Sequence, residues 1–180
     1  MSRDLVQQEI LDNIPNPAHG LLQLAPRVGK TKLGIDIIKR EKPKKILWVT
    51  PNTKLKDEDI PAEFKQWKAT TYLKKTDIIC YASLSNHKGN YDKIILDEYQ
   101  DLTLANVEPI LKGRITYKTI LGLSGTHPKH KDKQSIYDIL KLKSLVKMSI
   151  DEAVENNLIA PYKIKIKENK CLEILYNKKF

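Results

Sequence analysis

The sequence predicts an α/β fold in which helices cover both faces of a parallel β-sheet. Two observations support this fold class. Short apolar segments alternate with helical segments along the chain. Most of these apolar segments are continuously apolar, whereas a strand with one solvent-exposed face alternates polar and apolar residues. The expected strands lie at residues 20–25, 45–49, 77–81, 94–97 and 119–123. The expected helices lie at residues 2–14, 32–39, 60–67 and 104–111.

Local signals set several of these bounds. The first helix ends before Pro15-Asn16-Pro17, because proline cannot continue a helix. Residues 32–39 place apolar side chains at helical spacing, which indicates one buried face. The third helix has Pro61 in its first turn, where the missing backbone N–H costs nothing. In a sheet of this class, ligands bind at the carboxyl ends of the strands.

Composition bounds the class of protein. The chain has 180 residues, of which 41% are hydrophobic and 30% charged, as in a globular domain with a full core. No apolar run approaches the roughly 20 residues that span a bilayer, and the N-terminus lacks an apolar signal core. We therefore expect a cytoplasmic protein without a membrane partner. Cys80 and Cys171 are expected to be reduced thiols.

The net charge of +10 is unevenly distributed. Residues 1–111 carry 17 basic and 15 acidic side chains, whereas residues 112–147 carry nine basic and two acidic ones. A basic surplus favours contact with a polyanion through counterion release. The alternative is an ordinary solvated lysine surface, and the sequence leaves both interpretations open.

The segment Leu24–Thr31 ends in Gly-Lys-Thr and has the features of a phosphate-binding loop. Gly29 lets the backbone approach phosphate, Lys30 supplies a point charge, and the Thr31 hydroxyl is a ligand for Mg²⁺. The usual leading glycine is Leu24 here, so we expect a tighter or differently shaped loop with Arg27 over phosphate. The predicted nucleotide-binding residues are Gln7, Pro26, Arg27, Val28, Gly29, Lys30, Thr31 and Lys32.

A second motif follows the apolar strand at residues 94–96. Asp97 and Glu98 extend this strand, at the edge where the loop is also expected. Asp97 would hold the metal with Thr31, and Glu98 would polarise the attacking water. The two motifs together predict binding of ATP and Mg²⁺ and hydrolysis of ATP, with Lys30, Asp97, Glu98 and Gln100 as catalytic residues.

These motifs and their order resemble the first RecA-like domain of a superfamily 2 helicase or translocase. The resemblance is closest to the DEAH-like branch with type III restriction enzymes and phage helicases. Residues 3–11 resemble the family's glutamine motif, which implies adenine recognition by Gln7; the alternative is a surface glutamine. Residues 97–100 resemble its acidic box, in which Gln100 senses the terminal phosphate or links to the coupling motif that follows. Ser124-Gly125-Thr126 resembles the motif that couples hydrolysis to movement on nucleic acid.

Two further segments resemble family motifs that contact the nucleic-acid backbone. Their residues are Thr50, Pro51, Asn52, Thr53, Tyr81 and Ser83. Short polar groups suit phosphate oxygens, although the same residues are also common in turns after strands. Trp48, Phe64 and Trp67 are expected in the core and not as platforms for bases. His127 and His130 lack the partners of a metal site.

The resemblance implies that residues 1–162 form one RecA-like domain and that residues 163–180 lead towards a second one, in cis or in trans. The partner domain would supply the arginine finger. We therefore expect the nucleotide-binding half of a DNA helicase, with RNA a less favoured substrate, encoded by a phage and acting in its bacterial host. Alone it should bind nucleotide weakly, hydrolyse it poorly and not unwind a duplex.

Two other classes of function remain open. A degenerate nucleic-acid-binding module could keep the fold without turnover, as the replacement of glycine by Leu24 would allow. A P-loop kinase or transferase would share the loop, but the segment 124–126 argues against it.

Overall fold

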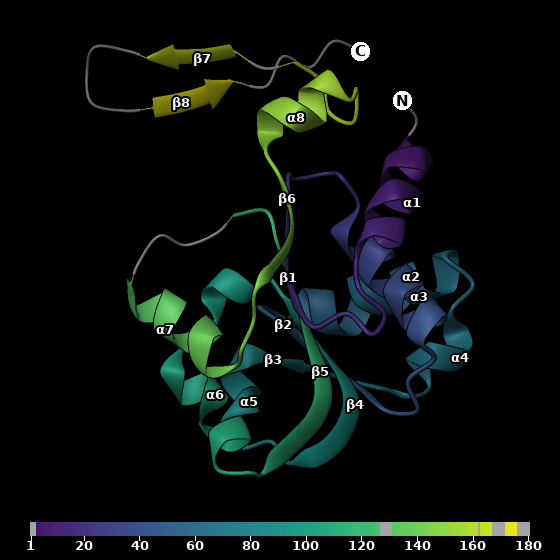
Figure 1. Ribbon diagram of the computed structural model, residues 1–180, viewed down its shortest axis with the longest axis vertical. Helices are drawn as coiled ribbons and strands as arrows, with labels where there is room; N and C mark the ends of the chain where they lie inside the picture. Colours follow the sequence, from purple (N-terminus) through teal and green to yellow (C-terminus); the bar gives the residue numbers. More distant parts are fainter. Residues whose placement is uncertain (1–2, 127–130, 162, 167–171, 176–180) are drawn as a thin grey trace.

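The computed structural model describes residues 3–126, 131–161, 163–166 and 172–175. At its centre lies a six-stranded sheet with the order β3-β2-β4-β5-β1-β6, in which all neighbouring strands run parallel (Figure 1). The strands are β1 (Gly20–Leu24), β2 (Ile46–Thr50), β3 (Thr76–Cys80), β4 (Gly89–Asp97), β5 (Ile115–Ser124) and β6 (Ser144–Met148). The predicted α/β fold with a parallel sheet is confirmed.

Helices lie on both faces of this sheet. They are α1 (Arg3–Asn13), α2 (Lys30–Glu41), α3 (Ile60–Gln66), α4 (Thr70–Leu73), α5 (Tyr81–Leu84), α6 (Leu104–Leu111), α7 (Lys131–Ile139) and α8 (Ile150–Glu155). A π-helical turn, Leu55–Asp59, precedes α3, and a 3₁₀ turn, Tyr99–Asp101, follows β4. Helices α1 to α3 pack on one face, and α5 to α7 pack on the other (Figure 1).

The core consists of two apolar clusters separated by the sheet. Successive residues of β2 alternate between them: Ile46 and Trp48 belong to the cluster under α1 to α3, whereas Leu47 and Val49 belong to the opposite one. All five residues of β2 are buried. This is the burial of a strand covered on both faces, and it explains the unbroken apolar sequence.

Helix α2 packs closely against the sheet because of its sequence. Leu33 and Ile37, four residues apart, are buried on the same face of the helix. Between them, Gly34 permits a close approach: a Cβ atom there would lie 3.0 Å from Cδ1 of Leu123. The position of α2 matters because its first residues are the predicted phosphate-binding residues.

The edge strand β6 and the helices α4, α5, α7 and α8 are not among the elements expected from the sequence. The edge strand β6 pairs with β1, and α7 precedes β6. Both lie in or next to the basic segment, and the apolar side chains of β6 are only half-buried. An edge strand has one neighbour, so its apolar pattern is short and weak. Strand β3 also ends one residue earlier than expected, because Tyr81 begins α5.

A separate two-stranded antiparallel sheet is formed by β7 (Lys163–Ile166) and β8 (Leu172–Leu175). It lies beyond α8 at the top of Figure 1 and does not extend the main sheet.

Candidate functional site

The sheet order brings the predicted motifs to one edge. Strand β5 lies between β1 and β4, and the register pairs Gln23 with Ser124 and Asp97 with Leu123. The carboxyl ends of the three central strands are therefore adjacent. Each is followed by one of the polar segments identified in the sequence.

The loop between β1 and α2 exposes backbone donors. Gly29 caps α2 in the left-handed region (φ 93°), and Arg27 also has a positive φ of 66°. Within the described residues, no side chain caps this end of α2. The first N–H groups of a helix then remain open to an anion, assisted by the helix dipole. Pro26 and Arg27 are exposed, whereas the Val28 side chain is buried.

Leu24 lies in the core and not in this loop. It is the last residue of β1, and its side chain is fully buried in the core. The predicted phosphate-binding loop therefore comprises Ala25 to Gly29, and Leu24 in place of the usual glycine adds a core side chain. The expectation of a tighter or differently shaped loop, with Arg27 over phosphate, stays a prediction.

Lys30 and Glu98 converge at the centre of the site. Nζ of Lys30 lies 2.6 Å from Oε1 of Glu98, with the two side chains 15% and 31% exposed. Glu98 itself has left-handed backbone angles (φ 53°, ψ 57°), an uncommon and strained conformation for a residue with a Cβ. Burial acts to raise the pKa of Glu98, but the hydrogen bond and charge of Lys30 outweigh it and leave this pKa below its usual value.

Asp97 is the deeper of the two carboxyl groups. It is 5% exposed at the end of β4. Burial, followed by the neighbouring charge of Glu98, raises the pKa of Asp97 to about 6, and Lys30 only partly opposes this. A carboxyl group in this environment gains most from a cation placed against it.

Polar contacts run from Glu98 to the end of β5. Nε2 of Gln100 donates to Oε2 of Glu98 at 3.1 Å, and the Ser124 hydroxyl donates to Oε1 of Gln100. The same hydroxyl lies 2.6 Å from the carbonyl oxygen of Thr126 and accepts from the Thr126 N–H at 2.9 Å. A hydroxyl has one proton, so Ser124 can donate to Gln100 or to Thr126 but not to both at once.

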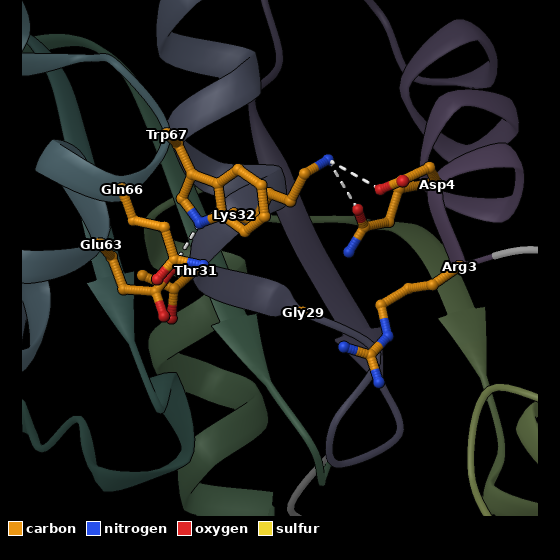
Figure 2. A pocket seen from close by; sticks show the side chains of 9 residues that line it. Arg3, Asp4, Gly29, Thr31, Lys32, Glu63, Gln66 and Trp67 are labelled. Atoms are coloured by element: carbon orange, nitrogen blue, oxygen red, sulfur yellow. Dashed lines mark hydrogen bonds and ion pairs between the residues drawn. The ribbon is translucent and has the colours of Figure 1, made fainter.

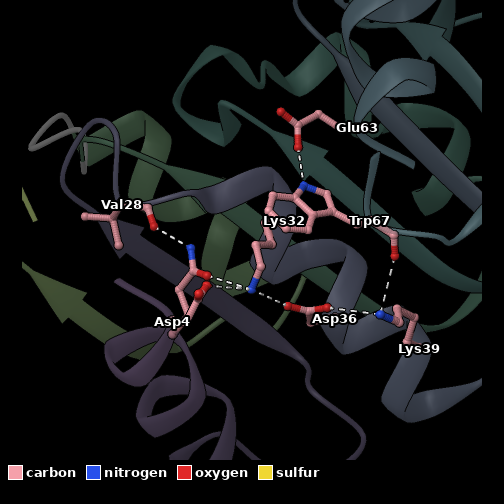
Figure 3. Close-up of polar contacts among 8 residues, drawn as sticks. Asp4, Val28, Lys32, Asp36, Lys39, Glu63 and Trp67 are labelled. Carbon is pink, nitrogen blue, oxygen red and sulfur yellow. Dashed lines mark hydrogen bonds and ion pairs between the residues drawn. The ribbon is translucent and has the colours of Figure 1, made fainter. Parts of the chain in front are cut away.

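Gln7 is held between the loop and α2. Its Nε2 donates to the Val28 carbonyl at 2.6 Å, and its Oε1 accepts from Nζ of Lys32 at 2.8 Å (Figure 3). The residue is only 2% exposed, so the alternative of a surface glutamine is wrong. The amide connects α1 to the loop, and adenine recognition by Gln7 stays a prediction.

The residues predicted to touch nucleic acid divide into exposed and buried ones. Asn52, Thr53 and Ser83 are exposed, and Asn52 accepts a hydrogen bond from the Leu55 N–H at 3.0 Å. Pro51 is partly exposed. Thr50 and Tyr81 are buried, so in this conformation their side chains present no surface for a phosphate backbone. Thr50 is buried because both faces of β2 are covered, and Tyr81 packs into the core under the sheet.

Comparison with known proteins identifies the fold. No protein-family model and no curated protein sequence matches the chain. The Type ISP restriction-modification enzyme LlaGI, solved as a nuclease-deletion mutant with a DNA substrate mimic, matches 85% of this chain at 17% identity and a TM-score of 0.60. The Hef helicase domain of Pyrococcus furiosus matches 81% at 13% identity and a TM-score of 0.59. The SWI2/SNF2 ATPase core of Sulfolobus solfataricus, bound to dsDNA, matches 87% at 14% identity and a TM-score of 0.52.

The chain has a RecA-like fold, which it shares with these three structures. It spans 20%, 36% and 45% of these three neighbours, less than half of each. The RecA-like fold accounts for the sheet edge at which the loop, the acidic pair and Ser124 meet. At these identities the likeness concerns the fold, and roles of individual residues must come from the geometry of this RecA-like domain.

The residues of the RecA-like domain fit a magnesium ion held mainly by a nucleotide. Among the described residues, no three or more His, Cys, Asp or Glu side chains are grouped as a metal site. Thr31 and Asp97 could supply one hydroxyl and one carboxylate. Mg²⁺ commonly binds in this way, with substrate phosphates and water as its other ligands. His127 and His130 lie outside the described residues.

Two lysines of the basic segment lie away from this site. Lys112 and Lys118 pair with Glu108 and Asp92, towards the amino edge of the sheet. Lys118 precedes Ser124 by six residues of β5, or about 20 Å along an extended strand. Of the two explanations for the charge, the structure favours a solvated surface for this part of the segment. None of the helices in the described part of the chain combines the length and apolar character of a membrane-spanning segment.

Asp4 and Trp67 lie beside the predicted residues Gln7 and Lys32, but neither was expected there from the sequence. A pocket of about 430 Å³ adjoins the loop and is lined by residues that include Asp4, Gln7, Lys32 and Trp67 (Figure 2). Trp48 and Phe64 are fully buried, as predicted, and meet edge to face. Trp67 packs against the core but also lines the pocket. The signal for Asp4 was its spacing: three residues before Gln7, it lies on the same side of α1. Cys80 is a free thiol, as predicted, and Cys171 lies outside the described residues.

Proposed function

We propose that this chain is the nucleotide-binding half of an ATP-dependent DNA helicase or translocase. The single observation that carries the proposal is the convergence of Lys30 and Glu98 at 2.6 Å, beside an open helix N-terminus. These groups come from positions 68 residues apart. They bring a phosphate-binding amine and a candidate general base to one point.

Binding of a nucleoside triphosphate would break the ion pair between Lys30 and Glu98. Lys30 would turn to the outer phosphates, which releases Glu98 to polarise a water molecule. Thr31 and Asp97 would hold Mg²⁺, which supplies charge neutralisation on the phosphates when bound. The high pKa of Asp97 supports this assignment, because its charge is poorly compensated by the protein alone.

The contacts of Gln100 support a coupling role for Ser124, Gly125 and Thr126. If Glu98 moves, the Nε2 donor of Gln100 loses its acceptor and the Gln100 amide can reorient. The Ser124 hydroxyl, which donates to Oε1 of Gln100, can then donate to the Thr126 carbonyl instead. Gly125 lies next to the same centre, since a Cβ there would come 3.4 Å from Nζ of Lys30. Asn52, Thr53 and Ser83 are the exposed candidates for contact with a DNA backbone.

We further propose that residues 1–162 act with a second RecA-like domain, in cis or in trans. The branch of the family, the preference for DNA over RNA, a phage origin and action in the host cytoplasm stay predictions of the sequence. The degenerate nucleic-acid-binding module remains the second candidate, although the burial of Thr50 and Tyr81 removes two of its predicted nucleic-acid contacts. The position of Leu24 in the core removes one reason for it.

Two measurements test the proposal. Magnesium-dependent binding of ADP and ATP should be measurable by titration calorimetry for the wild type and lost in Lys30→Ala. ATP hydrolysis with a second RecA-like domain supplied should rise on addition of single-stranded DNA, and Glu98→Gln should abolish it. Absence of nucleotide binding by the wild type contradicts the proposal, whereas binding without stimulated turnover favours the degenerate module.

A further inference from the structure

Four buried polar side-chain atoms have no hydrogen-bond partner among the described residues. They are Nε of Arg40, Nε1 of Trp48, Oγ1 of Thr50 and the hydroxyl oxygen of Tyr81. Buried donors normally have an acceptor, so each exception needs an explanation. Two of the four belong to β2, and they are the only side-chain donors of this strand, because its other three residues are apolar.

Trp48, Thr50 and Asp97 lie on one face of the sheet. Trp48 is paired with Ile95 in the parallel register, and both belong to the cluster under α1 to α3. Side chains alternate along a strand, so Thr50 and Asp97, each two residues further on, face the same side. The register also makes Thr50 and Asp97 the next opposite residues on strands about 4.8 Å apart. The Tyr81 side chain belongs to the cluster on the other face.

The indole of Trp48 is held firmly on this face. Its ring meets the ring of Phe64 edge to face, with the two centroids 5.6 Å apart. It also packs on α2, because a Cβ atom on Gly34 would lie 3.2 Å from Cη2 of Trp48. The side chain is fully buried. A donor whose rotamer is fixed by packing can orient the group to which it donates.

The electrostatics of Asp97 agree with this placement. Burial and the charge of Glu98 raise the pKa of Asp97 to about 6, whereas Lys30 and then the indole N–H of Trp48 act to lower it. The indole therefore stabilises the charged carboxylate, although Nε1 does not reach standard hydrogen-bond geometry in this conformation. A carboxylate has about four acceptor sites, so it can accept from two donors and still bind a cation.

We propose that Trp48 and Thr50 are positioning residues that donate to the Asp97 carboxylate and hold it in the orientation that Mg²⁺ requires. This inference rests on the proposed function, in which Asp97 and Thr31 hold the metal with the nucleotide. Groups that hydrogen-bond to a metal ligand from behind fix its orientation and tune the affinity for the metal. The inference gives Thr50 a role that its burial permits, in place of the predicted contact with nucleic acid.

The test measures magnesium dependence in the full 180-residue chain. ADP is titrated by calorimetry with Mg²⁺ and, separately, with EDTA, and the ratio of the two affinities reports on the metal. Thr50→Val keeps the shape of the side chain without its hydroxyl and should lower this ratio about tenfold, and Trp48→Phe should act similarly. Thr50→Ser keeps the hydroxyl and should retain the wild-type ratio. A merely structural loss weakens binding in both conditions and leaves the ratio unchanged.

A spectroscopic measurement follows the indole directly. The chain has two tryptophans, so Trp67→Phe assigns their two indole N–H signals in an NMR spectrum. Addition of Mg²⁺ to the ADP-saturated chain should shift the Trp48 signal, and Asp97→Asn should abolish this shift. Thr119→Val is the matched control: it removes a threonine hydroxyl from a buried position on β5 and should leave the affinity ratio as in the wild type.

The outcomes separate this inference from the function on which it rests. If the wild type binds ADP with magnesium dependence that Asp97→Asn removes, but Thr50→Val and Trp48→Phe keep the ratio, the positioning role is overturned and the proposed function stands. Loss of the ratio in Thr50→Ser or in Thr119→Val as well overturns the role of the Thr50 hydroxyl. A Trp48 signal that Mg²⁺ does not shift overturns the role of the indole. If the wild type binds no nucleotide, or binds it without magnesium dependence, the proposed function is overturned, and this inference with it.

Discussion

Two lysine–glutamate ion pairs lie at different ends of the molecule. At the carboxyl edge of the sheet, Lys30 and Glu98 meet at 2.6 Å with 15% and 31% of their side chains exposed. Lys93, in the middle of β4, meets Glu41, at the end of α2, at 2.8 Å, with side-chain exposures of only 1% and 7%. The chemistry of the two pairs is the same, but their surroundings differ.

Both members of the buried pair also form hydrogen bonds with backbone groups. Nζ of Lys93 also donates to the Ala18 carbonyl at 2.6 Å, and Oε1 of Glu41 accepts from the Ala18 N–H at 2.7 Å. The exposed pair instead involves a strained Glu98 and borders the open end of α2. The difference teaches that a satisfied buried pair fixes the fold, whereas a half-exposed pair can exchange its partners for a ligand.

The largest expected effect is on stability at the buried pair. Lys93→Met leaves the Glu41 carboxylate buried without its cation and should lower the free energy of unfolding by about 3–5 kcal/mol. Urea denaturation measures this loss. The double variant Lys93→Met with Glu41→Gln removes both charges and should recover most of the stability. A loss below about 1 kcal/mol in the single variant would show that the pair is not structural.

Replacing the lysine of the half-exposed pair should affect nucleotide binding more than stability. Lys30→Met should alter the free energy of unfolding by only about 1 kcal/mol or less, because half-exposed ion pairs contribute little. It should nevertheless weaken magnesium-dependent ADP binding by about a hundredfold, since charge-assisted contacts to phosphate are strong. Calorimetry gives both the affinity and its magnesium dependence. Lys39→Met, on the exposed face of the same helix, is the control.

A smaller effect should expose the strain at Glu98. Glycine adopts left-handed angles without a Cβ penalty, so Glu98→Gly should raise the free energy of unfolding relative to Glu98→Gln by roughly 0.5–1 kcal/mol. The comparison with Gln is needed because both variants lose the ion pair with Lys30. Equal unfolding midpoints for the two variants would mean that the backbone at this position is relaxed.

The smallest effect concerns pH at the amino edge. The side-chain hydrogen bond from Lys118, then the backbone N–H of Lys44, hold the pKa of Asp92 below its ordinary value. A carboxyl pKa that is lower in the folded than in the unfolded state stabilises the protein above the unfolded value of about 3.9. This stabilisation is lost as the pH falls through the folded-state pKa. The urea midpoint of Asp92→Asn should fall less than that of the wild type between pH 5 and pH 3.

Much of the fold could be predicted because the signals were local. Five of the six strands in the main sheet lie within a few residues of their expected places, since buried parallel strands are continuous apolar runs. The edge strand β6 could not be recognised in this way, because its half-buried residues depend on pairing with β1. The strand order itself contains no local signal.

The candidate site, like the fold, could be predicted where its residues belong to local sequence motifs. Gly29, Lys30 and Asp97-Glu98 have local motifs, and the parallel sheet brings them together. Gln7 was assigned to adenine because its motif is also local. In the structure, its hydrogen-bond partners are Val28 and Lys32, which lie 21 and 25 residues away along the chain. The packing of α1 on α2 brings them together.

The sequence by itself determined the class of fold, the edge at which a ligand would bind, and the amine and carboxyl groups gathered there. These follow from short-range periodicity and from the rule that parallel strands end on one side. Tertiary structure alone decided which polar groups remain open to solvent. The side chains of Thr50, Tyr81 and Gln7 are buried, whereas Asp4 remains exposed and pairs with Lys32. Burial is decided by the tertiary structure because it depends on neighbours that are distant along the chain.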